Sequence, residues 1–482
     1  MHISSYTEFE KLFKNQNFSQ VYSILNNANL SYLENIIDIV SKKKNSFIFE
    51  SIEKIKFRGR FTIFGFNSDQ TVDFNKDVEI YNKQIKSILK NNKLFFLKKI
   101  INKFRYKTSK HLPSMSSIMV GYFGYDIIRY YEKIPNSCSE DITIPDLRLF
   151  RPNFIIIYDN VTNKLFFIKN FYFKPQKLKN TFKKSINEIN TLINQVSRFK
   201  TKIKIPAKNK TISIKSNVSK KSFINSIIKA KKLIKDGEIF QVVLSQRFET
   251  ELNKKPIDFY KKLRELNPSP FMYYFNFKDF NIAGSSPEIL VRVKNKKVVI
   301  RPIAGTRPRG KNLLQDKKNA KELLNDKKEI SEHLMLLDLG RNDVGKVSTI
   351  GSVKVTEKFK IEKYSHVMHI VSNVEGKHNK KYSLIDTLLS GFPAGTVSGA
   401  PKIRAMEIID QLELAKRKLY AGGIGYFTAN GEMDTCIALR TALIKNKKIY
   451  IQSGAGIVAD SIPSKEYQET VNKAKALLES AR

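Results

Sequence analysis

The chain of 482 residues contains no tryptophan and only two cysteines. Cys138 and Cys436 are distant in sequence and lack the close spacing of metal-binding cysteines, so a reducing cytoplasm is the simplest interpretation. No apolar run is long enough to span a bilayer, and the N-terminus lacks the charged-then-apolar pattern of a signal peptide. These absences predict a cytoplasmic protein with no membrane partner.

Acidic residues are scarce beside basic ones, 45 against 86, which gives a formal net charge of +41. The lysines are spread along the whole chain and accompany many asparagines and isoleucines, as an AT-rich genome would produce. No RNA-binding motif of the aromatic-and-basic kind and no zinc-finger spacing is present, so we expect no specific nucleic-acid partner. The charge should instead help to attract anionic substrates.

One stretch, residues 198–222, has no acidic residue and no long apolar period, which is typical of a linker. We therefore place a basic linker at 198–220, between an N-terminal region, 1–197, and a C-terminal domain, 221–482. After the linker, short strands follow one another with tight turns, which favours an antiparallel sheet, and helices come later. The hydrophobic content of 41% is ample for a large core, and the pattern predicts an α+β protein.

Two pairs of glutamates, each three residues apart, are the most informative feature of the chain. Glu329 and Glu332 lie in EISEH, and Glu466 and Glu469 lie in KEYQE. Residues i and i+3 share one face of a helix, so each pair can direct its carboxylates at one spot. Hard cations such as magnesium prefer carboxylate oxygens. Either pair alone is more often a solvated helix face, but together with glycine-rich turns they favour a magnesium-bridged pocket for a small carboxylated substrate.

Three glycine-containing segments could hold an anion. PIAGT, with Gly305 and Thr306, is expected to close a strand; FPAGTVSGAPK, with Thr396, leads into a helix at Pro401; and Gly454–Gly456 ends a later strand. Free backbone N–H groups and small residues leave room for a carboxylate there. The alternative for each is an ordinary turn or helix entry. FPAGTVSGAPK lacks the GK[ST] ending of a phosphate loop, which argues against a nucleotide.

Arg440 is expected to lie in an otherwise apolar strand, CIALRTALI, where a buried arginine needs an anion. That anion is either a protein carboxylate or a substrate carboxylate bound in bidentate fashion. Tyr420 can add a hydroxyl donor. His369, taken alone, is more often a structural histidine.

These motifs resemble those of the chorismate-utilising enzymes and, among them, component I of anthranilate synthase. The resemblance covers the whole chain and is strongest from about 220 to 475. It rests on DGEIFQVVLSQR, NPSPFM, GSSPE, RPIAGTRPRG, EISEHLMLLDLGRND, FPAGTVSGAPK, GGIGYFTANGEMDTCIALRT and QSGAGIVADSIPSKEYQET. It implies two large antiparallel sheets packed together with helices outside, a regulatory role for residues 1–197 and a chorismate-binding catalytic domain at 221–482.

The resemblance also implies roles for the site residues. Glu332 and Glu469 would be magnesium ligands, with Glu329 and Glu466 acting through water. The carboxylates of chorismate would be bound by two sets of residues: Gly305, Thr306, Gly454, Ala455 and Gly456 at the ring carboxylate, and Tyr420, Arg440 and Lys473 at the enolpyruvyl carboxylate.

The implied reaction is amination at ring C2, loss of the C4 hydroxyl and elimination of pyruvate to give anthranilate. Gln241 stands where water-using relatives carry a lysine, which suits attack by ammonia, and Ala304 replaces the lysine nucleophile of one aminodeoxychorismate synthase branch. Glu288 is the candidate general acid for the hydroxyl, or else a structural carboxylate at a strand end. His369 is the candidate for proton transfer during pyruvate elimination, and Thr396 adds a hydroxyl to the catalytic set.

No glycine–cysteine–glycine nucleophile elbow is present, so ammonia would come from solution or from a separate glutamine amidotransferase subunit, in a complex of two copies of each. The resemblance further implies feedback inhibition by L-tryptophan, in a pocket where Phe271 replaces the usual tyrosine. The expected pocket residues are Glu50, Ser51, Pro270, Phe271 and Met272. Two alternatives stay open: aminodeoxychorismate synthase component I of the lysine-free type, and an inactive binding homologue.

Overall fold

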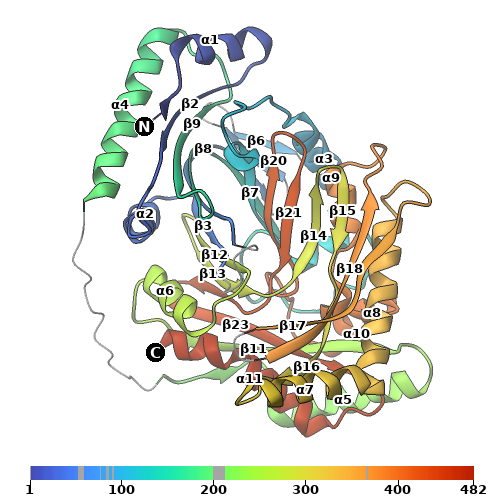
Figure 1. The fold of residues 1–482 in the computed structure, drawn as a ribbon. Helices are drawn as coiled ribbons and strands as arrows, with labels where there is room; N and C mark the ends of the chain where they lie inside the picture. The colour runs from blue at the N-terminus through green and yellow to red at the C-terminus, as the bar shows by residue number, and fades with distance from the viewer. Residues whose placement is uncertain are drawn as a thin grey trace.

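The strands of the chain form two antiparallel layers with helices on their outer faces (Figure 1). A computed structural model describes residues 2–52, 59–75, 78–82, 86–89, 92–198, 212–364 and 367–482. All ladders between the strands of these ranges are antiparallel. The expected α+β architecture of two packed sheets is confirmed.

The first layer joins strands from both halves of the sequence. Its order is β2 (Ser19–Leu25), β9 (Lys164–Phe171), β8 (Leu147–Asp159), β4 (Phe61–Phe74), β3 (Ser46–Glu50), β12 (Phe271–Asn276), β13 (Asn281–Ser286), β22 (Thr441–Lys445), β23 (Lys448–Ile457) and β11 (Gln241–Glu251). Short strands flank it: β1 (His2–Ile3), β10 (Lys215–Ser216) and β19 (Gly399–Ala400). Because β3 pairs with β12, the N-terminal region and the C-terminal part share one sheet.

The second layer also begins in the N-terminal region. Its order is β6 (Lys86–Leu89), β5 (Val78–Asn82), β4, β8, β7 (Ile118–Phe123), β20 (Gly423–Thr428), β21 (Met433–Ile437), β14 (Ile289–Lys294), β15 (Lys297–Ile300) and β18 (Val367–Lys377), which also pairs with β16 (Ile303–Pro308) and β17 (Lys354–Lys363).

The long strands β4 and β8 belong to both layers. Their register shifts between Ser68 and Gln70, opposite Pro152, and Asn67 has a φ of 57°. A bulge of this kind bends a strand and strengthens its twist, so each strand can leave one layer and enter the other. The space between the layers is filled by buried aromatic and branched side chains, among them Phe47, Tyr122, Phe150 and Tyr273.

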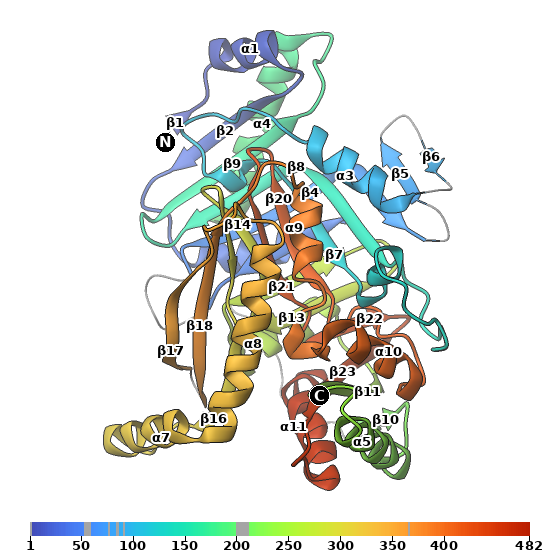
Figure 2. The same cartoon turned by 90° about the vertical axis from the view of Figure 1, so that its right-hand side faces the viewer.

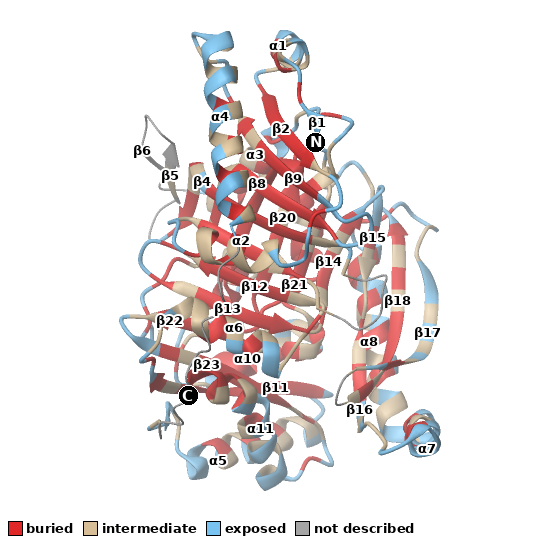
Figure 3. Cartoon of the chain, turned by 60° about the vertical axis from the view of Figure 1, so that its left-hand side comes forward, coloured by how far each residue is buried: buried red, intermediate tan, exposed pale blue. Residues whose placement is uncertain are grey.

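Helices cover both outer faces, and the buried strands lie between them (Figure 3). The first layer carries α1 (Tyr6–Asn15), α2 (Tyr32–Val40), α4 (Leu178–Ser197), α6 (Pro256–Leu266) and α11 (Pro463–Ala481). The second carries α3 (Lys93–Lys103), α8 (Lys327–Gly345), α9 (Leu384–Ser390) and α10 (Lys402–Leu412). Helix α5 (Lys220–Lys235) packs on β11 and α10, and α7 (Leu313–Asn325) leads into α8 (Figure 2).

The predicted linker falls partly outside the described residues, because 199–211 of the range 198–220 are not among them. The domain boundaries therefore stay a prediction. Helix α5 begins at Lys220, where the hydroxyl of Ser219 accepts a hydrogen bond from the Ser222 amide. In the part of the chain that the structure describes, no helix is both long and apolar enough to cross a membrane.

Candidate active site

Both glutamate pairs lie near the N-termini of helices, α8 and α11, at the lower end of the molecule in Figure 2. Burial raises the pKa of Glu332, and the negative charges of Glu329 on the same helix and of Glu469 on α11 raise that pKa further. Burial likewise raises the pKa of Glu466, with a further contribution from Glu469. The structure therefore brings the two pairs, 137 residues apart in sequence (469 minus 332), into one region of negative charge.

Three cations neutralise part of this charge. Arg307 and Lys328 were not predicted from the sequence, and Lys473 was expected at the enolpyruvyl carboxylate. The Arg307 guanidinium donates to Glu329 at 3.0 Å and to Asp326 at 2.6 Å. Lys473 pairs with Glu469 at 2.5 Å. Lys328 lowers the pKa values of Glu332 and Glu466 by its charge. Arg307 directly follows PIAGT, and Lys328 directly precedes EISEH. This adjacency to the predicted site segments was the only feature of the sequence that could have indicated their role.

Gln241 begins β11 directly beside Glu332. Its side chain is only 4% exposed, and its Nε2 donates to Glu332 Oε1 at 3.4 Å. Its Oε1 has no hydrogen-bond partner among the described residues. A Cβ at Gly456, on the neighbouring strand, would lie 2.6 Å from Gln241 Nε2. A side chain at 456 would therefore displace the Gln241 amide from this position.

The PIAGT segment opens strand β16 and does not close one, so that part of the prediction was wrong. Pro302 has no N–H to continue the ladder from β15, and pairing with β18 resumes at Ile303. Gly305 sits at a register shift with a φ of 66°, and a Cβ there would lie 3.2 Å from Glu329 Oε2. The turn is therefore adjacent to the carboxylates.

His369 lies on β18, opposite Thr306. Its Nδ1 is 3.0 Å from the carbonyl of Gly305 and 3.1 Å from the Thr306 hydroxyl. Donation to the carbonyl assigns the proton to Nδ1 and leaves Nε2 as a base. Burial lowers the pKa of His369, and the charges of Arg440 and Lys473 lower it further, so the ring is neutral at neutral pH.

Arg440 does not lie in a strand, contrary to expectation. Strand β21 ends at Ile437 and β22 begins at Thr441, and Arg440 lies between them with a φ of 47°. The reason is topological: β21 pairs with β14 and β20 in one layer, whereas β22 pairs with β13 and β23 in the other. Burial lowers the pKa of Arg440. Among the described residues no carboxylate lies within ion-pair distance of its guanidinium, and those of Glu329, Glu469 and Asp434 pair with other cations.

Tyr420, Gly454 and Lys473 form one wall of the same region. The buried Tyr420 hydroxyl is hydrogen-bonded to the backbone of Gly454, and burial raises its pKa to about 12. Lys473 donates to the Gly454 carbonyl at 3.1 Å. A Cβ at 454 would lie 2.6 Å from the Tyr420 oxygen. The next residue, Ala455, packs into the core between β11 and α5, so only its backbone can face a ligand.

Glu288, between β13 and β14, meets Thr396 of the FPAGTVSGAPK segment. Glu288 is 7% exposed, and burial raises the pKa of its carboxyl to about 8, while the hydrogen bond from the Thr396 hydroxyl, at 3.1 Å, works against that rise. Both residues line a small cavity that Asp343 also lines. At neutral pH the Glu288 carboxyl is mostly protonated and can act as an acid.

The segments expected to bind tryptophan are also brought together. Met272 pairs with Glu50 across β12 and β3. The Glu50 carboxylate is buried and already accepts hydrogen bonds, from Tyr260 at 2.6 Å and from Arg264 at 3.2 Å. Phe271 pairs with Ser286, two residues before Glu288. Pro270 and Ser51 adjoin these strands.

The fold and this site define a chorismate-binding enzyme. A family model described as chorismate binding enzyme matches residues 44–479, and the chain belongs to that family. It is 44% identical to anthranilate synthase component 1 of Acetivibrio thermocellus over 442 residues, which cover 90% of this chain and 89% of that protein.

Two solved structures resemble the whole fold. Anthranilate synthase component I from Streptococcus pneumoniae is 38% identical, with a TM-score of 0.77, over 89% of this chain and 94% of that one. MenF, the menaquinone-specific isochorismate synthase from Escherichia coli, is 18% identical, with a TM-score of 0.72, over 99% of each chain. The second likeness shows the fold alone.

Proposed function

We propose that this chain is the large subunit of anthranilate synthase, which converts chorismate and ammonia to anthranilate and pyruvate in the first committed step of L-tryptophan biosynthesis. One observation carries the proposal: the carboxylates of α8 and α11 gather at one end of a site in which Arg440 has no counter-ion among the residues that the structure describes. Such a site is complementary to a dicarboxylate held by a cation at one end and by arginine at the other. The 44% identity to component 1 supports the same activity.

Magnesium suits the carboxylate end. In the described ranges no three Asp, Glu, His or Cys side chains are close enough to hold a metal ion by themselves. Mg²⁺ usually takes one or two protein carboxylates, keeps water and completes its shell with substrate oxygens, so two facing glutamates fit it. Glu332 and Glu469 would supply those carboxylates, with Glu329 and Glu466 acting through water. When bound, the ion would neutralise the ring carboxylate of chorismate.

The remaining contacts orient the substrate. The backbone of Gly305, Thr306 and Gly454–Gly456 lies next to the carboxylate cluster and would meet the ring carboxylate. Arg440, together with Tyr420 and Lys473, would bind the enolpyruvyl carboxylate. Two fixed anions leave the ring little freedom to rotate, which places C2 before the nucleophile.

Gln241 favours ammonia as that nucleophile. Ammonia attacks without prior deprotonation, whereas water needs a base, and an amide is not one. The unpartnered Oε1 of Gln241 can accept a hydrogen bond from the N–H of ammonia. Ala304 offers no amine for a covalent alternative.

Two proton transfers complete the reaction. Glu288, oriented by Thr396, gives its proton to the C4 oxygen as that carbon–oxygen bond breaks. His369, held at Nδ1 by the Gly305 carbonyl, uses Nε2 to take the proton from C2 as pyruvate departs. Each group has the protonation state at neutral pH that its role requires.

Ammonia would reach the site from a glutamine amidotransferase subunit, in a heterotetramer of two copies of each chain. L-Tryptophan would inhibit by binding at Glu50, Ser51, Pro270, Phe271 and Met272. The pairing of Phe271 with Ser286 gives a short backbone route from that pocket to Glu288.

The test supplies purified chain with chorismate, Mg²⁺ and an ammonium salt. We expect anthranilate, detected by its fluorescence, and pyruvate in equal amounts. Accumulation of 4-amino-4-deoxychorismate would establish the folate-pathway alternative instead, and the absence of any product would indicate an inactive homologue.

The magnesium assignment has its own test in Glu332→Gln. Calorimetric titration with Mg²⁺ in the presence of chorismate should show binding to the wild-type chain and a loss of affinity in the variant. Glu479→Gln, at the C-terminal end of α11 and far along the helix from Glu466 and Glu469, is the matched control and should bind as the wild type does. Unchanged binding by Glu332→Gln would refute the assignment.

A further inference from the structure

Arg417 is a buried arginine that is not itself one of the proposed substrate-binding residues, and it connects three of the segments that carry them. Its side chain is 1% exposed, and it pairs with Glu413, which is 5% exposed. The guanidinium donates to both oxygens of Glu413, at 2.9 and 2.6 Å. Glu413 is fixed in turn by the backbone amide and the hydroxyl of Ser245, both at 2.8 Å.

The remaining N–H groups of Arg417 reach two backbone carbonyls. One belongs to Val397, at 2.8 Å, directly after Thr396. The other belongs to Val243, at 2.6 Å, two residues after Gln241 on β11. The guanidinium therefore links the turn that carries one proposed catalytic residue to the strand that carries another.

The third segment holds Tyr420. The Arg417 guanidinium lies over the Tyr420 ring, 5.4 Å from its centroid, and over the Tyr125 ring at 5.0 Å. A planar guanidinium can donate in its plane and stack through its face at the same time, which a lysine ammonium cannot do. Arg417 thus fixes the aromatic ring whose hydroxyl meets the backbone of Gly454.

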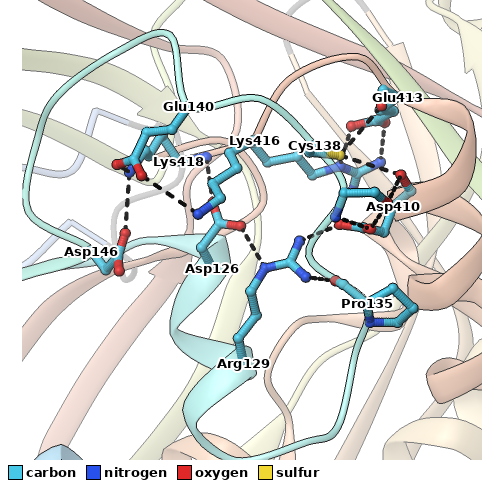
Figure 4. A network of polar contacts seen from close by, with 12 residues as sticks. Asp126, Arg129, Pro135, Cys138, Glu140, Asp146, Asp410, Glu413, Lys416 and Lys418 are labelled. Atoms are coloured by element: carbon cyan, nitrogen blue, oxygen red, sulfur yellow. Dashed lines mark hydrogen bonds and ion pairs between the residues drawn. The ribbon is translucent and has the colours of Figure 1, made fainter. Parts of the chain in front are cut away.

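The backbone around Tyr420 needs such support, because Lys418 and Ala421 have φ values of 50° and 63°. Non-glycine residues hold such conformations only where the surroundings impose them. Figure 4 shows how the segment is anchored: Lys418 contacts Glu140 and Asp146, and Asp126 accepts a hydrogen bond from its amide. These anchors hold the backbone from outside, whereas Arg417 reaches from this segment both to β11 and to the turn after Thr396.

We propose that Arg417 is a positioning residue for the reaction: it sets the distance between Tyr420, Thr396 and Gln241, and so the fit of the site to the enolpyruvyl carboxylate. This rests on the proposed function in one respect, the assignment of Tyr420 to that carboxylate. The alternative is a buried ion pair that only stabilises the fold.

The experiment is a double-mutant cycle of Arg417→Lys and Tyr420→Phe, with KM for chorismate and kcat measured for all four proteins. Arg417→Lys keeps the charge but cannot make four hydrogen bonds and stack. We expect kcat/KM to fall by about 10²-fold, mostly through KM, since a displacement near 1 Å costs that much. In the Tyr420→Phe background the same change should cost far less, because the hydroxyl that Arg417 positions is already absent.

Arg148→Lys is the matched control. Arg148, with 11% of its side chain exposed, pairs with Asp73 at 2.8 Å and lies over the rings of Phe277 and Phe280, but it lies away from the site. Its change should leave kcat/KM of the folded protein within about twofold in both backgrounds, as independent sites do. Melting curves check that each variant folds. Glu413→Gln, which removes the negative charge that Arg417 pairs with, replaces Arg417→Lys should that variant not fold.

Equal losses in the two backgrounds would overturn the proposal and leave Arg417 as a stabilising residue. Failure of the proposed function is a separate result, seen when the wild-type chain makes no anthranilate. In that case the dissociation constant of chorismate is measured by calorimetry for the same four proteins. The coupling between Arg417 and Tyr420 is expected to persist in these constants.

Discussion

The corner where β4 and β8 pass between the layers and the candidate active site both contain half-buried arginines, but in different electrostatic settings. At the corner, Arg148 pairs with Asp73 at 2.8 Å and Arg151 with Asp69 at 2.6 Å, each through two hydrogen bonds. In the site, Arg440 has no carboxylate partner in the described residues, and Glu288 has a hydroxyl partner in place of a cation. A charged group that is paired with its counter-charge stabilises the fold. A group without a counter-charge is available to bind a ligand or to transfer a proton.

The largest test of this comparison exchanges the two arginines for glutamine. Arg440→Gln should lower kcat/KM for chorismate by about 10³-fold, since the substrate carboxylate loses its charged partner, and should leave stability unchanged or raised. Arg148→Gln should lower the free energy of unfolding by about 3–5 kcal/mol, because Asp73 stays buried and unpaired, with normal kinetics for the folded fraction. Steady-state kinetics and urea unfolding measure both. The comparison fails if Arg440→Gln destabilises the chain as Arg148→Gln does.

The second test concerns Glu288, an acid whose pKa burial raises to about 8. Glu288→Gln removes the proton donor and should lower kcat by about 10²-fold or more. The wild-type rate should fall as pH rises through about 8, as the acid loses its proton, and the variant should lose that limb of the profile.

Glu288 should also affect stability. Its folded pKa lies above its unfolded value near 4.5, so the folded state binds the proton more tightly. Its contribution is present below pH 4.5 and is lost as pH rises toward 8, a change of about 5 kcal/mol at most. Glu288→Gln should flatten that part of the pH dependence of unfolding, and an unaltered slope would contradict the assignment.

The sequence predicted best those features that depend on local pattern. The spacing of Glu329 with Glu332 and of Glu466 with Glu469 placed each pair on a helix, and the α8 and α11 boundaries agree. These signals lie within a few residues of each other.

The features that were missed depend on pairing between distant segments. Arg440 leaves its strand because the chain changes layers there, and PIAGT begins a strand because β18 pairs with β15 and β16 in turn. The links from Arg417 to Val243 and Val397 cross more than a hundred residues in one case. No local periodicity encodes such contacts, since they are set by tertiary packing.

A third test uses His333, which is buried without a charged partner but outside the site. Its Nε2 lies 2.7 Å from the Ser372 hydroxyl, and burial lowers its pKa to about 4. The unfolded chain would protonate near pH 6.5, so stability is full above that pH and is lost as pH falls toward 4, by about 3 kcal/mol at most. Urea unfolding at pH 7 and pH 5 should show less of this loss in His333→Gln. His111→Gln, at an exposed position, is the control and should behave as the wild type.

The smallest effect is expected from Phe271→Tyr, which restores the hydroxyl that the family resemblance leads one to expect in the tryptophan pocket. One added hydrogen bond contributes about 0.5–1.5 kcal/mol, so inhibition by L-tryptophan should tighten by about two- to tenfold. The kcat without inhibitor should not change, because Phe271 lies on β12, away from the carboxylates of α8 and α11.

Phe95→Tyr, an exposed position on α3, controls for the general effect of an added phenol. Tightening confined to Phe271→Tyr would place the inhibitor against β12, where Glu50 is already bound by Tyr260 and Arg264. The inhibitor pocket would then resemble the β4–β8 corner, because its buried carboxylate, Glu50, is paired with an arginine. Glu50 would shape the pocket and would not bind the inhibitor by its charge. Inhibition that is equal in both variants and in the wild type would remove Phe271 from the inhibitor site and leave the paired Glu50 as a purely structural group.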